Sequence, residues 1–294
     1  MNVIKNYDHF LLVYNEILNG YSRSRKYNCY VKHFSQKDNA EILSAKIDYY
    51  NSLVADGVPS EESRLAFLKE NDLWTDKDED DILTAKYAIS DNEKISKDLT
   101  SPSQRQMMKK IIDGKREELA VLERKKRSLI GPTAEFYSLN FLSEQTVKSS
   151  FFKDEGLRTP LLTNEEYERL SDEEFSEMYD EFYQIRQRFD ERQMRILACL
   201  PVSLNNMGLC KKNLRLLIDK PVTDYTSFQM DLVNKCMRNI NVLENSEGEP
   251  PELTDDLKEQ DLLDWYDLNY SVWQGKLKNN SGDGIKTKTN YVKK

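Results

Sequence analysis

The sequence contains two histidines and four cysteines, whose side chains can act as nucleophiles, as bases or as soft metal ligands. His33 lies four residues after Cys29, so a helix would place both on one face. Tetrahedral zinc needs further ligands, and no Cys-x-x-Cys pair or third histidine supplies them. A Cys–His nucleophilic pair likewise lacks a third group to orient it. The spacing therefore predicts neither a metal centre nor a catalytic thiol.

Carboxylates in one segment imitate a calcium-binding loop. Asp76, Asp78 and Asp80 alternate as in an EF-hand, but the sixth position is Asp81 instead of glycine and the twelfth is Tyr87 instead of glutamate. We interpret these acids as the solvated start of a helix. The sequence also lacks a glycine-rich phosphate loop and a Gly-x-Ser-x-Gly elbow. We therefore expect no enzyme, no metal and no cofactor. A metal-dependent enzyme whose scattered carboxylates converge only in the fold is the third alternative.

The segment over residues 20–37 combines cations with aromatic rings and contains no acid. Single-stranded nucleic acids bind in positively charged grooves where their bases stack on aromatic side chains. The candidate nucleic-acid-binding residues are Arg23, Arg25, Tyr27, Tyr30 and Lys32. A second basic stretch over 105–127 could extend this surface, although cations near a helix C-terminus also complement the helix dipole. The alternative for 20–37 is that the rings join a core while the cations remain in water.

The composition limits which partners the chain can have. It has 294 residues, a net charge of −8, and 32% charged residues, so a nucleic-acid coat or a binder of anionic membranes is disfavoured. No stretch reaches the roughly 18 apolar residues of a membrane-spanning helix, and the amino terminus lacks the apolar run of a signal peptide. Cysteines without paired spacing are typical of reduced thiols. We expect a cytoplasmic protein without a membrane partner.

Helix-start signals recur along the chain. Thr163 and Ser171 are each followed three residues later by glutamate, which is the spacing of a capping box. Ser60 and Thr75 carry looser versions, with acids in the first turn where the helix dipole favours them. Glycine and proline are scarce, which argues against an all-β fold with many tight turns. These signals predict an all-α, multi-helix protein.

One helix is expected to be much longer than the others and to lie centrally. Ser101-Pro-Ser103 opens it and Gly131-Pro132 ends it, so that it spans about 104–130, roughly 40 Å. Gly156 and Pro160 mark a domain boundary over 155–163. The expected parts are an N-terminal helical domain over 1–155, a second helical part over 163–245, a linker over 246–253, a separate acidic C-terminal helix over 254–277 and a flexible tail over 278–294.

The expected C-terminal helix has its own charge and its own apolar face. Ten acids accompany one lysine between Glu244 and Asp267, and Pro250-Pro251 separates the helix from what precedes it. Amphipathic helices with aromatic anchors commonly dock in a groove of a partner. We expect this role for Leu262, Trp265, Tyr266 and Trp273. The groove would lie on another protein or on the long helix over 104–130; alternatively, the helix folds back onto its own domain.

Several phrases together give the chain a resemblance to a known class. They are Leu68-Lys-Glu-Asn-Asp-Leu-Trp-Thr75 with Glu79 and Ile82, Gln106, Leu129-Ile-Gly-Pro-Thr-Ala-Glu135, Asp219-Lys-Pro-Val-Thr-Asp-Tyr225 with Gln229, Pro250-Pro251 and Asp264-Trp-Tyr266. With these phrases the chain resembles structural and tail-assembly proteins of large contractile-tailed bacteriophages, over most of its length. The resemblance implies a virion or tail component, structural or chaperone-like, whose partners are tail or baseplate proteins. It carries over no site residue.

The sequence thus predicts a non-enzymatic protein–protein interaction component, in the host cytoplasm or in the virion. The alternative is a nucleic-acid-binding accessory protein that uses the basic segments 20–37 and 105–127. The balance of nine cations to four acids between Arg105 and Arg127 also suits docking against an acidic surface, in another chain or in another part of this one.

Overall fold

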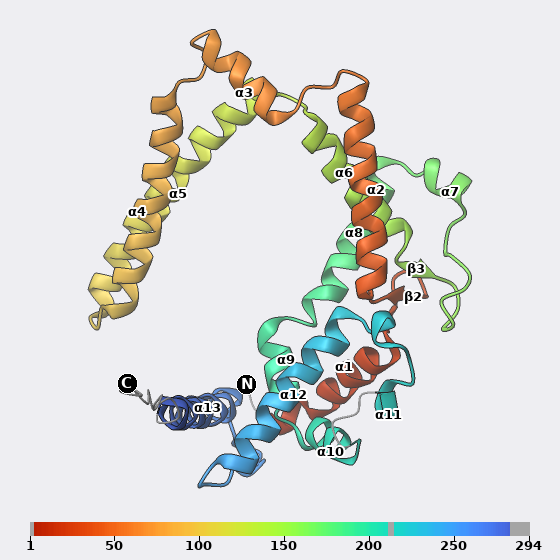
Figure 1. Cartoon of the computed structure of the whole chain (residues 1–294), viewed down its shortest axis with the longest axis vertical. Helices are drawn as coiled ribbons and strands as arrows, with labels where there is room; N and C mark the ends of the chain where they lie inside the picture. The colour runs from red at the N-terminus through yellow and green to blue at the C-terminus, as the bar shows by residue number, and fades with distance from the viewer. Residues whose placement is uncertain (1–2, 211–214, 283–294) are drawn as a thin grey trace, which may run out of the picture. The chain divides into compact units, whose positions relative to one another are not determined.

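The computed structural model describes residues 3–210 and 215–282 of the chain (Figure 1). This part of the chain is 72% helical, which confirms the all-α prediction. The chain divides into two compact units. Unit 1 consists of Met1–Ile42 and Glu144–Lys294, and unit 2 consists of Leu43–Ser143.

Unit 1 joins the N-terminal segment to the C-terminal half of the sequence. Its elements are η1 (Ile4–Asn6), α1 (Tyr7–Asn19), β1 (Tyr21–Ser24), β2 (Cys29–Lys32), β3 (Phe151–Phe152), α7 (Asn164–Glu168), α8 (Asp172–Gln187), α9 (Glu191–Leu197), α10 (Pro201–Leu209), α11 (Arg215–Ile218), η2 (Val222–Asp224), α12 (Ser227–Asn245) and α13 (Glu259–Gly282).

A small antiparallel sheet in unit 1 has the strand order β1-β2-β3. A helix would place Cys29 and His33 on one face, but this segment is not helical. Cys29 begins strand β2 of a β-hairpin, and His33 directly follows the last residue of that strand. Ser22 pairs with Val31 across the hairpin, and Val31 pairs with Phe151 of β3. Burial alternates along both hairpin strands, as expected for a sheet with one covered face.

The end of α1 shows why the N-terminal segment belongs to unit 1. Gly20 ends the helix in the left-handed conformation, with φ of 78°. The side-chain amide of Gln229 donates to the carbonyl oxygens of Ile17 and Leu18 in the last turn of α1, at 3.0 and 2.9 Å. Gln229 itself belongs to the capping box that Thr226 forms at the start of α12.

The core of unit 1 is one cluster to which α1, the hairpin, α8, α9, α12 and α13 all contribute. Among its fully buried side chains are Phe10, Ile17, Met194, Leu197 and Phe151. Because the first 42 residues fill this cluster, the chain divides elsewhere than at the expected boundary over 155–163. The divisions fall within α2 and within α6.

Unit 2 is built from long helices. Helix α2 (Gln36–Ala55) enters it and α6 (Ala134–Lys148) leaves it, and between them lie α3 (Glu61–Glu70), α4 (Asp76–Asp98) and α5 (Pro102–Ile130). Helix α5 has proline in its first turn and Gly131 after its last residue, as the sequence predicts for the long helix over 104–130. Helix α4 lies along α5 (Figure 1). The unit has a small core in which Leu68, Trp74, Ile82 and Ile130 are buried.

The helix starts follow the sequence signals closely. Complete capping boxes are present at Thr75, Thr163 and Ser171, and Ser60 accepts a bond from the backbone of Ser63. The C-terminal helix, α13, begins five residues later than expected and continues to Gly282. The expected tail over 278–294 therefore starts in helical backbone, and its residues 283–294 lie outside the described part of the chain. Among the described residues, no helix has the length and apolar character needed to cross a membrane.

Candidate functional site

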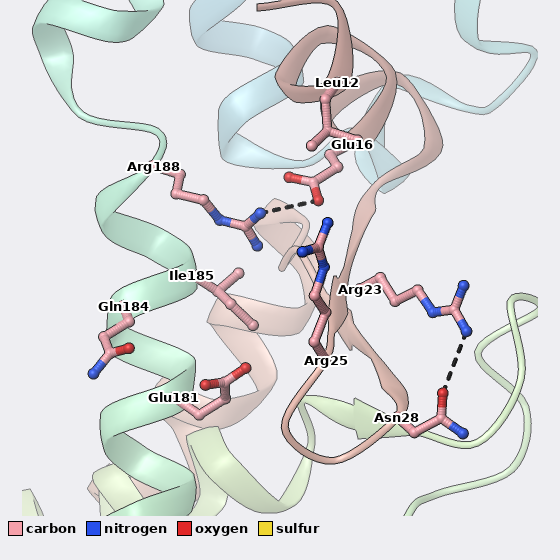
Figure 2. Close-up of a pocket in the computed structure, with 9 residues that line it drawn as sticks. All are labelled: Leu12, Glu16, Arg23, Arg25, Asn28, Glu181, Gln184, Ile185 and Arg188. Carbon is pink, nitrogen blue, oxygen red and sulfur yellow. Dashed lines mark hydrogen bonds and ion pairs between the residues drawn. The ribbon is translucent and has the colours of Figure 1, made fainter. Parts of the chain in front are cut away.

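An open pocket of about 570 Å³ lies in unit 1 between α1, the β1–β2 hairpin and α8 (Figure 2). We call it the arginine pocket, because three guanidinium groups line it. The residues that line it are Leu12, Glu16, Arg23, Arg25, Asn28, Glu181, Gln184, Ile185 and Arg188. Its walls come from three segments that are far apart in the sequence, and the fold alone brings them together.

A buried chain of polar groups runs inward from the pocket wall. Arg188 donates to Glu16 at 3.2 Å, and the other carboxylate oxygen of Glu16 accepts from the Ser22 hydroxyl at 3.1 Å. Ser22 also lies 2.8 Å from Nε2 of His33. Burial raises the pKa of Glu16, although Arg188 and the Ser22 hydroxyl act in the opposite direction.

The hydrogen bonds among these polar side chains determine which atoms carry the protons. The Ser22 hydroxyl has one proton, and an ionised Glu16 can only accept, so Ser22 donates to Glu16. His33 must then carry its proton on Nε2 and donate to Ser22. Burial, with Arg186 and Arg188 nearby, lowers the pKa of His33 to about 3, so the ring is neutral. With Ser22 fully buried and its histidine partner acting as a donor, the pair is not arranged as a nucleophile and a base.

The exposed side of the pocket is formed by the hairpin. Arg23 donates to the Asn28 side chain at 3.2 Å, and Glu181 accepts from the Ser24 hydroxyl at 2.6 Å. Arg25 is exposed, and within the described residues it has neither a hydrogen bond nor an ion pair. Figure 2 shows the side chain of Arg25 extending into the pocket towards Glu16 and Arg188.

Three of the five candidate nucleic-acid-binding residues are engaged elsewhere. The Tyr27 ring packs edge-on against Phe151, and the Tyr30 hydroxyl donates to Glu155 at 3.1 Å. Lys32 forms an ion pair with Asp38 at 2.6 Å. Only Arg23 and Arg25 meet in the arginine pocket. The arrangement of Tyr27 fits the alternative in which the rings of this segment pack on a core.

The second basic stretch lies on α5, where it faces the acids of α4. Lys125 pairs with Asp78 at 3.0 Å, and Lys126 pairs with Glu79 at 2.7 Å. Further along the two helices, Arg116 pairs with Glu93 at 2.6 Å. Much of the basic charge over 105–127 is therefore balanced inside unit 2. Of the three aspartates that resemble a calcium loop, Asp78 pairs with Lys125 and completes the cap of α4, and Asp76 pairs with Lys69. The described residues contain no group of three His, Cys, Asp or Glu suited to a metal.

The cysteines are buried and free of disulfides. Burial raises the pKa of the Cys29 thiol to about 11 and that of Cys236 to about 12. It raises the pKa of Cys199 as well. These three thiols stay protonated near neutral pH, and a protonated thiol is a poor nucleophile and a poor metal ligand.

The candidate partner-binding residues of the C-terminal helix divide into two pairs. Leu262 and Tyr266 are buried in the core of unit 1, where α13 packs against α9 and α12. Asp267 also accepts from Arg238 of α12 at 2.7 Å. The helix thus folds back onto its own unit, which was the alternative to docking, and Leu262 and Tyr266 are not free to enter a groove of a partner. Trp265 and Trp273 are half-buried, and partner binding by them stays a prediction.

Sequence reasoning found two of the pocket's charged residues and missed the other three. Glu16 and Glu181 lie on helices with ordinary amphipathic spacing, and Arg188 directly follows the last residue of α8, so no local signal pointed to them. Comparisons of the chain with protein-family models, with curated proteins and with solved structures found no match.

Proposed function

We propose that this chain is a non-enzymatic protein–protein interaction component. In line with the resemblance of its sequence, we propose that it acts in the assembly of the tail or virion of a contractile-tailed bacteriophage, as a structural or chaperone-like subunit. The observation that supports this best is the exposed apolar surface of the long helices of unit 2.

Two pairs of exposed apolar side chains on the long helices of unit 2 each lie one helical turn apart. On α4 they are Leu83 and Tyr87, which are 49% and 68% exposed. On α5 they are Met107 and Ile111, which are 67% and 43% exposed. Residues four apart lie on the same face of a helix, so each pair forms an apolar strip. Single exposed apolar residues are ordinary, but contiguous apolar surface commonly marks a site of protein interaction.

The opposite faces of α4 and α5, which contact each other, support this interpretation. Ile82 and Ile112 are buried in unit 2, and ion pairs connect the flanking positions of α4 and α5. Along one side, therefore, α4 and α5 already bury apolar side chains and pair their charges with each other. The apolar strips on their remaining surface are not needed for that pairing, and an assembly partner would remove them from water.

The test is recovery of a stoichiometric complex. The tagged full chain would be purified from the cells that naturally produce it, and its complexes would be sized by light scattering and identified by mass spectrometry. In Met107→Glu/Ile111→Glu the apolar strip of α5 becomes charged, and we expect the partner to be lost. Gln104→Glu/Gln106→Glu is the matched control, because it adds the same charge at exposed positions of the same helix. Recovery of the wild-type chain only as a free monomer, or equal partner retention by both variants, would contradict the proposal.

Nucleic-acid binding is the second candidate, and one observation favours it: Arg23 and Arg25 reach a common open pocket. Binding through phosphates should weaken steeply with added salt, because counterions are released on binding. A gel shift with single-stranded DNA over a range of salt tests this, with Arg23, Arg25 and Lys32 changed to Glu. We expect no shift at physiological salt. A salt-sensitive shift that the changes abolish would place this candidate first.

A further inference from the structure

Among the residues that the structure describes, the lining of the arginine pocket carries a net charge of +1. Its three arginines face two glutamates. Glu16 is paired with Arg188, and Glu181 is hydrogen-bonded to Ser24. Arg23 donates to the neutral side chain of Asn28. Arg25 has no partner within the described residues, and its guanidinium extends into the pocket. Arginine loses little by remaining in water, so the free charge costs the protein little, but it leaves a ready site for an anion.

The donors around this point suit a carboxylate. A guanidinium presents five N–H donors in a planar fork, and a carboxylate can accept through several lone pairs on its two oxygens. The ion pair with Glu16 uses Nη1 of Arg188, and no other hydrogen bond of the Arg188 side chain is present within the described residues. One carboxylate placed between Arg25 and Arg188 could therefore accept from both, in the space where Figure 2 shows the two side chains converging.

Charge and size narrow the identity of the ligand. A singly charged carboxylate neutralises the pocket, whereas a doubly charged phosphate group would leave net negative charge beside Glu16 and Glu181. A bare carboxylate fills little of a pocket of about 570 Å³. Leu12 and Ile185 add apolar surface to the lining, which the methylene groups of a glutamate side chain could contact. The geometry therefore favours a carboxylate that is carried on a longer group.

We propose that the arginine pocket binds a glutamate side chain in a segment of a partner protein, held between Arg25 and Arg188. This inference rests on the proposed function, because it names the chemistry of one contact that a protein partner would make. It is independent of the apolar strips of unit 2, so the two surfaces can be tested separately.

The experiment uses the full-length chain labelled with nitrogen-15 at arginine. The Nε–Hε signals of Arg25 and Arg188 are followed by NMR during titration with the peptide acetyl-Ala-Glu-Ala-amide. We expect saturable shifts of both signals with this peptide and none with acetyl-Ala-Gln-Ala-amide, which has the same shape without the charge. Arg25→Gln should weaken binding at least tenfold.

Lys26→Gln is the matched control for Arg25→Gln. It removes one positive charge at the adjacent position, but Lys26 pairs with the exposed Glu177 and does not line the pocket. Binding to this variant should stay within twofold of wild type. Equal weakening by both variants would show that the peptide senses only the general field, and would overturn the proposal.

Two further titrations test the ligand class. Tighter binding of inorganic phosphate than of the glutamate peptide would overturn the choice of a carboxylate. Equal binding of acetyl-glutamate amide and of the peptide would show that the pocket takes a free small molecule instead of a segment. If the peptide fails while the chain still forms a stoichiometric complex, the pocket assignment fails alone. If the peptide binds but no complex is ever recovered, the proposed function fails alone.

Discussion

Glu16 on α1 and Arg188 at the end of α8 form an ion pair, with 3.2 Å between Oε1 and Nη1, although 172 positions separate them in the sequence. The glutamate side chain is 10% exposed and the arginine side chain 30% exposed. The pair therefore connects the N-terminal helix to the C-terminal half of the chain. Because both side chains are largely buried, removing one of them leaves the other charge unpaired and poorly solvated.

Glu16→Gln tests how much this pair contributes to the free energy of unfolding. The amide keeps an acceptor for Ser22 but leaves Arg188 unpaired. We expect the free energy of unfolding of unit 1 to fall by about 1–3 kcal/mol, below the cost for a fully buried pair because Arg188 is partly wet. Urea unfolding followed by circular dichroism measures it. Glu177→Gln breaks the exposed pair with Lys26 and should leave the free energy of unfolding nearly unchanged. Equal losses in the two variants would contradict the prediction.

His33 gives unit 1 a dependence on pH. The ring is neutral in the folded chain, where burial lowers its pKa to about 3, and ionises near 6.5 when unfolded. Between these values the unfolded chain binds one more proton, so stability is full above pH 6.5 and falls as the pH drops, by about 1.4 kcal/mol per pH unit. Arg186 and Arg188 add to this fall, whereas Glu16, whose pKa burial raises, opposes it.

The measurement compares the free energies of unfolding of wild type and His33→Gln at pH 7 and pH 5. The glutamine keeps a donor for Ser22 and cannot titrate in this range. Wild type should lose about 2 kcal/mol more than the variant over this interval. His9→Gln, which changes an exposed histidine on α1, should behave as wild type. A parallel decline of wild type and His33→Gln would show that other groups set the pH dependence.

Trp74 holds the small core of unit 2. Its side chain is fully buried with Leu68, Ile82 and Ile130 around it, and its Nε1 donates to Glu79 at 2.7 Å. Removing a buried aromatic side chain costs about 3–5 kcal/mol, and unit 2 has few other buried residues to absorb the loss. Hydrogen exchange read by mass spectrometry should quicken over 61–130 in Trp74→Ala and stay unchanged over 164–245. Trp74→Phe, which keeps a ring, should show a smaller change. Exchange that quickens equally in both ranges would contradict this localisation.

How far the sequence predicted the structure depends on whether a feature is local. The capping boxes at Thr75, Thr163 and Ser171 and the long helix α5 were predictable, because the backbone of one short segment decides each of them. The hairpin was not predicted. Its buried face contains Ser22 and Ser24, small polar residues that hide the alternation of a strand, and their burial depends on Glu16 and Glu181 from helices.

The residues of the candidate site also divide into those with a local sequence signal and those that only tertiary packing brings together. Arg23 and Arg25 stood out because cations and rings cluster in one stretch of sequence. Arg188 and the two glutamates of the pocket could not be found, since only packing brings them to the hairpin. The pairing of α5 with α4 had a usable signal: a short connection forces the two helices to lie antiparallel, which sets the acidic start of α4 beside the basic end of α5.

The C-terminal helix makes the sharpest distinction between core and interface. Tyr266 is buried in unit 1, so Tyr266→Ala should lower the free energy of unfolding by about 3 kcal/mol or more. Trp273 is half-buried and rests against Tyr270, with 5.8 Å between ring centroids. If Trp265 and Trp273 anchor a partner, changing either to alanine should weaken the complex by roughly 2 kcal/mol or more while the fold of unit 1 is nearly kept.

Val272→Ala is the control for the tryptophan variants, because it truncates an exposed apolar side chain next to Trp273 on the same helix. Thermal unfolding and the dissociation constant of the recovered complex would be measured for all four variants. The docking role predicts that Trp265→Ala and Trp273→Ala change the dissociation constant far more than the melting temperature, and that Tyr266→Ala does the reverse. Should both tryptophan variants lower the melting temperature as Tyr266→Ala does and leave the complex intact, the whole apolar face of α13 serves the core of unit 1, and the partner binds elsewhere.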